Sequence, residues 1–215
     1  MNAIKEYTPK MFDHLIDLPG FSKQSMRTHL ALYQGHVNNT NLLAEMMREL
    51  LTIGKSGTVS WAEMKRRFGW EFNGMRLHEY YFDNLTPTPK PLSQQSRLYQ
   101  KIIQDFGSFL LWKQGFIGTG VIRGVGWVIL AFDPQSGRLF NLWLDEHDMG
   151  LLVGTQPLLV MDVFEHAFLL DYGLQRNKYE EAFFNVIDWE RVENRVRTCL
   201  KDQVASVSEK AEASA

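Results

Sequence analysis

The sequence predicts an α+β protein, in which an N-terminal helical hairpin domain is followed by a three-stranded antiparallel sheet with flanking helices. In the first third of the chain, apolar residues recur at the spacing of α-helices. Beyond the proline-rich segment 86–91, short apolar runs alternate with turn residues, which is typical of strands. We therefore expect a helical domain over residues 1–90, an α/β domain over residues 91–200 and a disordered tail over residues 201–215.

Residues 1–20 are expected to form an irregular segment before the first helix. Ser22 or Ser25 can cap that helix, because a serine hydroxyl accepts a hydrogen bond from the free backbone N–H groups of a first helical turn. Apolar residues follow at helical spacing to residue 51. This pattern predicts one long helix, or two helices in line with a break near Asn38-Asn39.

A glycine-containing turn over residues 54–57 ends this helix. A short helix over residues 59–68 and another over residues 74–85 are expected to complete the N-terminal domain. The prolines of the segment 86–91 favour an extended connector, because proline disfavours helical backbone in the residue before it. We place the domain boundary in this connector.

The C-terminal half is expected to combine helices with a small sheet. A hairpin turn over residues 133–137 contains Asp, Pro and Gly, so the strands on either side should pair in antiparallel fashion. The expected elements are, in chain order, a helix over 94–113, a glycine-rich segment over 115–126, strands over 127–132, 138–144 and 158–161, and helices over 162–170 and 180–199.

Composition excludes several classes of protein. The formal net charge of −2 gives no electrostatic reason to expect a nucleic-acid partner. The N-terminus lacks the apolar core of a signal peptide, and no apolar run is long enough to cross a membrane. Cys199 is the only cysteine, so the fold has no internal disulfide, as is usual in a reducing compartment. We expect a cytoplasmic protein without a membrane partner.

The first candidate site residues are Asp162 and His166, which lie four positions apart directly after an apolar run. Side chains at this spacing near the start of a helix can point the same way, as two metal ligands must. Each residue alone has a simpler interpretation, Asp162 as a helix N-cap and His166 as a hydrogen-bonded histidine of the core or surface. A metal site needs further ligands from elsewhere in the chain.

The stretch 162–167 resembles the D-x-W-E-H-A signature of iron and manganese superoxide dismutases, with Phe164 where that family usually has tryptophan. Ser22 stands seven residues before His29, as a helix-opening serine does before the first ligand of the family. His78 lies in a stretch similar to the family pattern N-H-x-x-Y-W-x-x-L. The resemblance runs in order from about residue 20 to 195, with further matches at Val37-Asn38-Asn39, Gly124-Val125-Gly126-Trp127, Asp171-Tyr172, Arg176, Tyr179, Ala182-Phe183, Asn185 and Trp189.

The resemblance implies one iron or manganese ion per chain, with iron slightly favoured. Its four ligands would be His29, His78, Asp162 and His166. Three neutral imidazoles and one carboxylate suit a first-row transition ion better than magnesium or calcium. Zinc accepts such ligands but has no redox chemistry. The implied function is that of a superoxide dismutase, which converts superoxide to oxygen and hydrogen peroxide by redox cycling of the metal.

Three further residues are implied to take part in catalysis, namely His36, His147 and Tyr172. His36 takes the place of a family tyrosine near the substrate channel, and it lies seven residues after His29 on the same helix face. The alternative for His36 is a partly exposed histidine unrelated to the metal. His147 stands where manganese forms carry a glutamine that hydrogen-bonds the metal-bound solvent. The position that carries this glutamine in iron forms is Gly74.

The resemblance also implies a homodimer, in which Glu165 of each chain contacts His166 of the other. A histidine–tyrosine pair that links many family members across this interface is missing, because Leu169 takes the tyrosine's place and the histidine is absent near Leu32-Tyr33. Two other functions remain open. One is a non-catalytic metal-binding or structural member of the same fold. The other is a mononuclear non-haem oxygenase, which would need only two histidines and one carboxylate.

Overall fold

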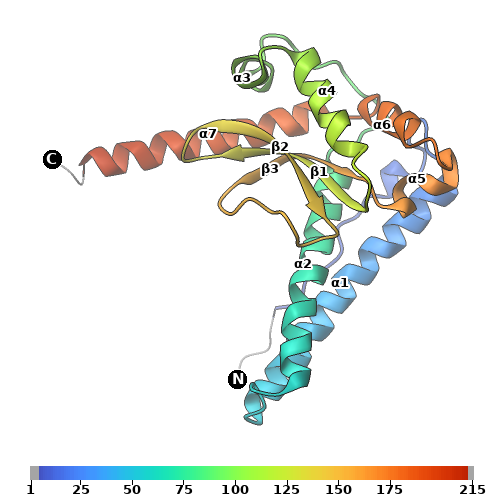
Figure 1. Ribbon diagram of the computed structural model, residues 1–215, viewed down its shortest axis with the longest axis vertical. Coiled ribbons are helices and arrows are strands. Elements are labelled where there is room, and N and C mark those ends of the chain that lie inside the picture. The colour runs from blue at the N-terminus through green and yellow to red at the C-terminus, as the bar shows by residue number, and fades with distance from the viewer. Residues whose placement is uncertain (1–4, 213–215) are drawn as a thin grey trace.

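The computed structural model describes the backbone of residues 5–212 and the side chains of residues 5–200. Its elements are the 3-10 helix η1 (Asp13–Leu15), the helices α1 (Lys23–Thr52), α2 (Val59–Asp83), α3 (Arg97–Phe106) and α4 (Phe109–Gly120), the strands β1 (Gly126–Asp133), β2 (Arg138–Asp145) and β3 (Gln156–Asp162), and the helices α5 (Glu165–Tyr172), α6 (Arg176–Phe184) and α7 (Trp189–Glu212). The α+β fold class is confirmed (Figure 1).

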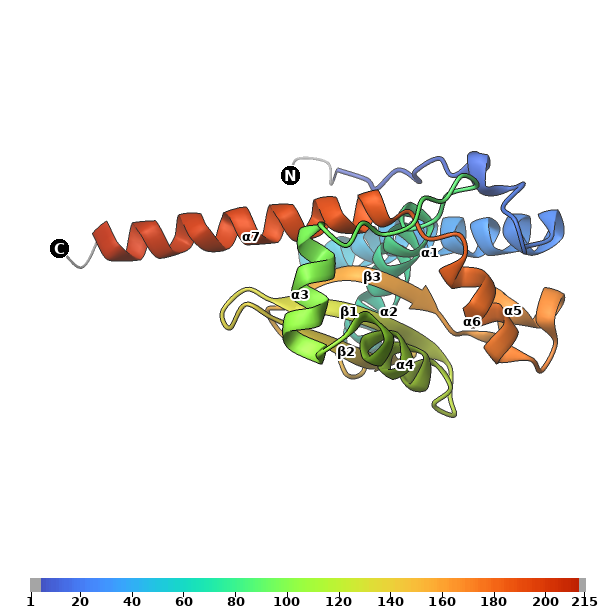
Figure 2. The ribbon, with the colours of Figure 1, turned by 90° about the horizontal axis from the view of Figure 1, so that it is seen from above.

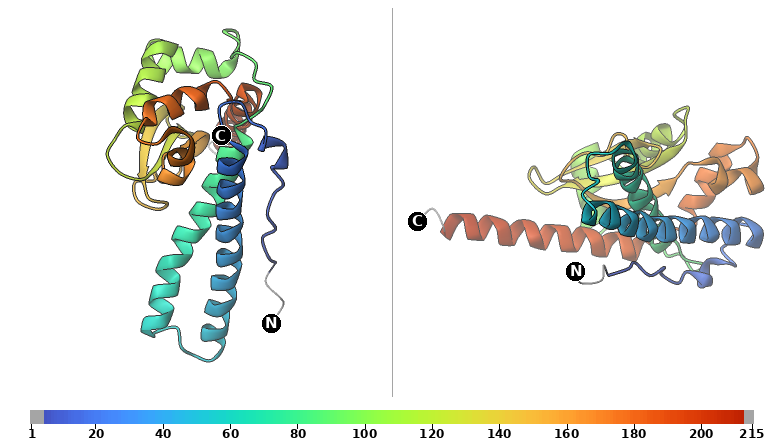
Figure 3. Two further views of the ribbon diagram at one scale, coloured as in Figure 1. Left: turned by 90° about the vertical axis from the view of Figure 1, so that its right-hand side faces the viewer. Right: turned by 90° about the horizontal axis from the view of Figure 1, so that it is seen from below.

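Helices α1 and α2 form a long hairpin whose turn lies far from the sheet (Figure 3). The hydroxyl of Ser22 accepts a hydrogen bond from the backbone N–H of Ser25, so Ser22 is the cap of α1. The helix runs unbroken through Asn38-Asn39, where a break was one of two expectations. The side-chain amide of Asn39 donates a hydrogen bond to Glu71 of α2 at 3.2 Å. It therefore does not compete with the helix for the backbone hydrogen bonds of α1.

Helix α2 corrects the expectation of two separate helices over residues 59–68 and 74–85, because it is continuous from Val59 to Asp83. The segment between the two expected helices contains Gly69 but no proline. A glycine inside a helix costs only about 1 kcal/mol relative to alanine. Packing of α2 against α1 outweighs this cost, since tertiary contacts supply most helical stability in proteins.

The expected single helix over residues 94–113 is instead two helices, α3 and α4. Gly107 has a φ of 83°, a left-handed conformation that glycine adopts readily and that ends α3. The hydroxyl of Ser108 then accepts a hydrogen bond from the backbone N–H of Leu111 and caps α4. Helix α4 continues to Gly120, into the glycine-rich segment.

The three strands form an antiparallel sheet in the order β2-β1-β3, as expected. The central strand β1 is buried over all but its last residue. Its register on β3 pairs Trp127 with Asp162, and it shifts between Leu130 and Ala131. Pro157 lies beside this irregularity on the edge strand, where a missing N–H is tolerated. The register brings Asp162 to the end of the sheet from which β1 starts.

Two corrections concern the C-terminal helices. Asp162 is the last residue of β3 and does not belong to the helix expected over 162–170, because α5 begins only at Glu165. The carboxylate of Asp162 accepts the backbone N–H of Phe164 at 2.8 Å, which turns the chain between strand and helix. The helix expected over 180–199 is divided between α6 and α7.

Helix α7 continues to Glu212, through most of the segment 201–215 for which we expected disorder. Residues 213–215 lie outside the described residues. The division of the chain into domains near residue 90 stays a prediction. Within the described part of the chain, no helix combines the length and the apolar character needed to span a bilayer.

The helical hairpin and the sheet share one hydrophobic core. Helix α2 packs against β3, α1 packs against α5, and α3 and α4 cover β2 and β1 (Figure 2). The core includes Tyr33 from the hairpin, Ile129 from the sheet and Phe183 from α6, all essentially inaccessible to solvent. This continuity fixes the positions of side chains that come from α1, α2, β3 and α5.

Candidate metal centre

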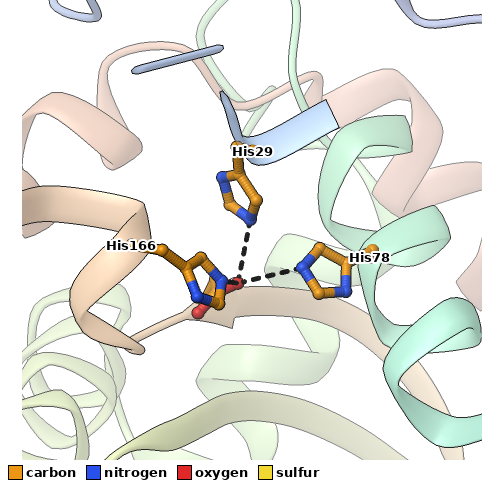
Figure 4. A group of neighbouring side chains, drawn as sticks. His29, His78 and His166 are labelled. Atoms are coloured by element: carbon orange, nitrogen blue, oxygen red, sulfur yellow. Dashed lines mark hydrogen bonds and ion pairs between the residues drawn. The ribbon is translucent and has the colours of Figure 1, made fainter. Parts of the chain in front are cut away.

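Four potential ligand side chains converge where α1, α2, β3 and α5 meet (Figure 4). They are His29, His78, Asp162 and His166. The Oδ2 atom of Asp162 lies 3.0 Å from Nε2 of His29 and 3.1 Å from Nε2 of His166. It lies 3.6 Å from Nε2 of His78. One ligand atom from each residue lies within 4.8 Å of all the others, so the four side chains are grouped around one place where a single ion could be held.

The ring of His78 is oriented by its own helix. Its Nδ1–H donates to the backbone carbonyl of Gly74, one turn earlier, at 2.6 Å. The other nitrogen, Nε2, therefore carries a lone pair, and it is buried without a hydrogen-bond partner among the described residues. Such unpartnered buried groups are rare in folded proteins. A transition-metal ion in the cluster would satisfy this nitrogen, so the residues present fit a metal.

Two hydrogen bonds hold Asp162 in place. Its Oδ1 atom accepts the N–H of Phe164, which leaves Oδ2 facing the three imidazoles. Its backbone carbonyl accepts the hydroxyl of Tyr179 at 2.5 Å. Hydrogen bonds of this kind orient a ligand and tune its basicity.

The cluster is closed to solvent except at His166, whose side chain is 23% exposed. Burial lowers the pKa of His29, and it lowers the pKa of His78 well below its usual value. Burial would raise the pKa of Asp162, but the neighbouring His166 and His29 hold it well below its usual range. Burial would lower the pKa of His166, but the Asp162 carboxylate raises it. The ionised carboxylate and the neutral rings of His29 and His78 are the forms that bind a transition metal, and a metal bound to His166 would displace the proton that Asp162 favours there.

An open cavity of about 490 Å³ borders the cluster at His166. Both His36 and His147 line it, so the structure brings together two of the three residues that the sequence analysis placed in catalysis. Tyr172 lies elsewhere, because its hydroxyl donates to the backbone carbonyl of Gly20 and its side chain does not line the cavity.

The ring of His36 lies between α1 and α2. Its Nδ1 atom is 2.7 Å from Oε2 of Glu71, and the other oxygen of Glu71 accepts hydrogen bonds from Asn39 and Arg67. Burial lowers the pKa of His36, although Glu71 acts to raise it. A Cβ atom on Gly74 would lie only 2.7 Å from the same Nδ1 atom. The missing side chain at Gly74 therefore makes room for the His36 ring.

His147 follows β2 and reaches the cavity through an unusual turn. Glu146 before it has a φ of 48°, a conformation that no other non-glycine residue adopts between residues 5 and 212. The carboxylate of Glu146 accepts the indole N–H of Trp70 at 2.8 Å. The indole N–H of Trp127 donates to Nδ1 of His147 at 3.0 Å. Burial lowers the pKa of His147 to about 3.

Sequence reasoning missed Glu71 and Arg67 as members of the site. Spacing in the sequence could have identified Glu71, because it stands seven residues before His78 and so lies on the same face of the helix. Arg67 precedes Glu71 by one turn and bonds to it at 2.9 Å. This side of α2 therefore lines the cavity and the cluster over several turns.

Gly74→Ala is expected to lower the free energy of unfolding by about 1–3 kcal/mol, because the added methyl group would overlap the His36 ring. Helix propensity alone would favour alanine by about 1 kcal/mol. Gly69→Ala on the same helix is the matched control, because nothing lies within 4 Å of its Cβ position, and it is expected to stabilise. Urea unfolding of the three proteins measures both effects. Equal stabilisation by both substitutions would contradict the close packing of His36.

Comparison with known proteins agrees with this geometry. Residues 94–195 match the family described as iron/manganese superoxide dismutases, C-terminal domain. Manganese superoxide dismutase 2 of Haloferax volcanii is 33% identical over 186 residues, which cover 86% of this chain and 92% of that protein. The iron superoxide dismutase of Cupriavidus metallidurans is 33% identical over 188 residues, with coverages of 86% and 93%. That of Aquifex pyrophilus is 33% identical over 206 residues, with coverages of 93% and 95%.

These alignments extend over both the helical hairpin and the sheet, and so over all the elements that supply the cluster. The relatives include proteins named for iron and proteins named for manganese, so the similarity does not distinguish the two metals. The fold, the order of its elements and the similarity over most of its length show that this chain belongs to the iron/manganese superoxide dismutase family.

Proposed function

We propose that this protein is a superoxide dismutase that holds one iron or manganese ion through His29, His78, Asp162 and His166. The observation that carries the proposal is the buried convergence of three imidazoles on one carboxylate oxygen, with Nε2 of His78 left without a partner among the described residues. The ion would supply one-electron redox chemistry, which zinc, magnesium and calcium do not offer.

The surrounding residues would bind the substrate and supply hydrogen bonds. Superoxide is a small anion, and the cavity at His166 gives it a route to the cluster. Arg67 lines this cavity with its guanidinium 4.1 Å from the ring centre of Trp70, and its side chain is 46% exposed. Although it is paired with Glu71, the partly exposed guanidinium would offer an anion a charged hydrogen-bond donor at the mouth of the cavity. Within the cavity, His36 and His147 would place imidazole groups beside the metal-bound solvent or the substrate.

The same site supports a homodimer in which Glu165 of each protomer contacts His166 of its partner. Glu165 is exposed on the isolated chain, and His166 is the ligand that reaches the surface. Leu169 and Leu170 on the same helix are 46% and 55% exposed, and they give this surface apolar side chains that a partner could cover.

Glu165→Arg is expected to convert the dimer to a monomer, because it would place a cation against the imidazole of His166 in both copies of a two-fold interface. Sedimentation velocity at micromolar concentration measures the change. Glu181→Arg, an exposed glutamate of α6, serves as the control and should leave the dimer intact. A wild-type protein that sediments as a monomer would contradict the proposed interface.

The test of the function is to prepare the protein with iron, with manganese and with zinc, and to measure metal content and superoxide dismutation together. We expect close to one ion per chain in each preparation and activity with iron or manganese only. Zinc is the matched control, because it fits the same ligands without redox chemistry. Protein that binds no stoichiometric metal would instead favour a structural member of the fold. Oxygen uptake that depends on an organic co-substrate would favour an oxygenase.

A further inference from the structure

The two histidines of the cavity have partners of opposite hydrogen-bonding character. Nδ1 of His36 faces the carboxylate of Glu71 at 2.7 Å. Nδ1 of His147 faces the indole N–H of Trp127 at 3.0 Å. An ionised carboxylate only accepts hydrogen bonds, whereas an indole N–H only donates them. The two partners therefore require opposite states of the Nδ1 atoms.

A neutral imidazole carries one proton, which sits on either Nδ1 or Nε2. Because Nδ1 of His36 must donate to Glu71, its Nε2 atom is left as an acceptor. Because Nδ1 of His147 must accept from Trp127, its proton is on Nε2, which becomes a donor. Neither Nε2 atom has a hydrogen-bond partner among the described residues. Neither atom is fully buried, so each is at least partly accessible to solvent or to a ligand.

We propose that Glu71 and Trp127 are positioning residues that fix opposite tautomers in His36 and His147, so that the cavity presents one imidazole acceptor and one imidazole donor. The donor of His147 suits an anionic oxygen. The acceptor of His36 suits an O–H group, such as that of water or of the hydrogen peroxide product. The use of this pair in dismutation rests on the proposed function, whereas the tautomers themselves do not.

The surroundings make both arrangements rigid. Glu71 is 2% exposed, and Arg67 and Asn39 bind the oxygen that does not face His36. The imidazole of His147 is stacked on Phe164 with ring centres 4.7 Å apart. The rings of His36 and His147 are 4.9 Å apart and nearly perpendicular, and both side chains line the same cavity.

The test is the tautomeric state of each ring, measured by long-range ¹H–¹⁵N correlation spectra of ¹⁵N-histidine protein at pH 8.5. Metal-free and zinc-loaded samples are both diamagnetic and suitable. Signals are assigned with His36→Gln and His147→Gln. The wild-type protein is expected to show His36 protonated on Nδ1 and His147 protonated on Nε2. The opposite tautomer at either ring would overturn the proposal without the need for any other variant.

Two substitutions then separate the positioning residues. Glu71→Leu should shift the proton of His36 towards Nε2 and leave His147 unchanged, and Trp127→Phe should affect His147 alone. Arg67→Gln is the control, because it removes a partner of Glu71 but keeps the carboxylate, and it should leave both tautomers unchanged. An unaltered His36 tautomer in folded Glu71→Leu would also overturn the proposal.

The activity of the iron- or manganese-loaded proteins tests whether the two tautomers are used in catalysis. Loss of a group that orients an active-site residue typically costs 10- to 100-fold, and we expect Glu71→Leu to lose about tenfold in superoxide dismutation. Correct tautomers in a wild-type protein without dismutase activity would refute the proposed function and leave the tautomer assignment intact. Full activity of Glu71→Leu with an altered His36 tautomer would refute the catalytic use of the pair.

Discussion

Asp162→Asn is expected to lose most of its bound iron or manganese and to reduce superoxide dismutation by more than about 100-fold. Oδ1 of Asp162 accepts the N–H of Phe164, so the carbonyl oxygen of an asparagine would occupy that position. The amide NH₂ group would then replace Oδ2, which faces the three imidazoles. The substitution would therefore remove the only negative charge of the cluster and turn a donor group towards the nitrogen lone pairs.

This substitution isolates the charge of Asp162 from the shape of its side chain. The turn between β3 and α5 keeps its hydrogen bond, so the far-ultraviolet circular dichroism spectrum should remain that of the wild type. Asp17→Asn is the matched control, because Asp17 pairs with Lys23 on the surface, where an ion pair contributes little to stability. Metal analysis and activity are measured on all three proteins. A fully metallated and active Asp162→Asn protein would refute the ligand assignment.

The sequence predicted those parts of the fold that depend on local chemistry. The turn over residues 133–137 contains an aspartate whose side chain accepts backbone N–H groups and a glycine with φ of 68°, and the predicted hairpin is present. The predicted break of α2 was wrong, because packing against α1 outweighs the cost of Gly69. The division of the helix expected over 94–113 was missed, although Gly107 and Ser108 carry the local signals of a helix end and a helix start.

The four potential ligands could be identified from spacing and resemblance, and the structure places all four in one cluster. The residues that support them could not, because their role depends on contacts between distant segments. Trp127 meets His147 because β1 and β2 pair, which brings the start of β1 beside the residues that follow β2. Glu71 meets His36 because α1 and α2 lie side by side. Tyr172, which the resemblance implied as a further catalytic residue, donates its hydroxyl to the carbonyl of Gly20 and does not line the cavity, and its role stays a prediction.

Glu180→Gln is expected to stabilise the protein at pH 8 by about 3 kcal/mol and to have little effect at pH 4.5. Glu180 of α6 is inaccessible to solvent, and neither of its carboxylate oxygens has a hydrogen-bond partner among the described residues. Its Oε1 atom lies against Gly120 at the end of α4. Burial raises the pKa of Glu180 to about 7, although Arg176 one turn earlier acts to lower it.

The sign of the effect follows from where the proton is bound. Between pH 4.5, the ordinary pKa of a glutamate, and pH 7, the unfolded chain has lost the proton of Glu180 while the folded protein retains it. The unfolded state therefore binds fewer protons, and the stability of the wild type falls as the pH rises through this window. The loss levels off as the pH rises past this folded-state pKa, so that it is nearly complete at pH 8. A glutamine at this position has no proton to lose, so the variant lacks this decrease.

The measurement is the free energy of unfolding in urea at pH 4.5, 6 and 8 for the metal-loaded wild type, Glu180→Gln and Glu181→Gln. Glu181 is the next residue of α6 and is exposed, so its substitution should leave the pH dependence unchanged. Release of metal at low pH affects all three proteins alike and cancels in the differences between them. A difference between wild type and Glu180→Gln that stays constant from pH 4.5 to 8 would contradict this prediction. It would show that the carboxyl group has the same pKa in the folded and unfolded protein, with Arg176 balancing the effect of burial.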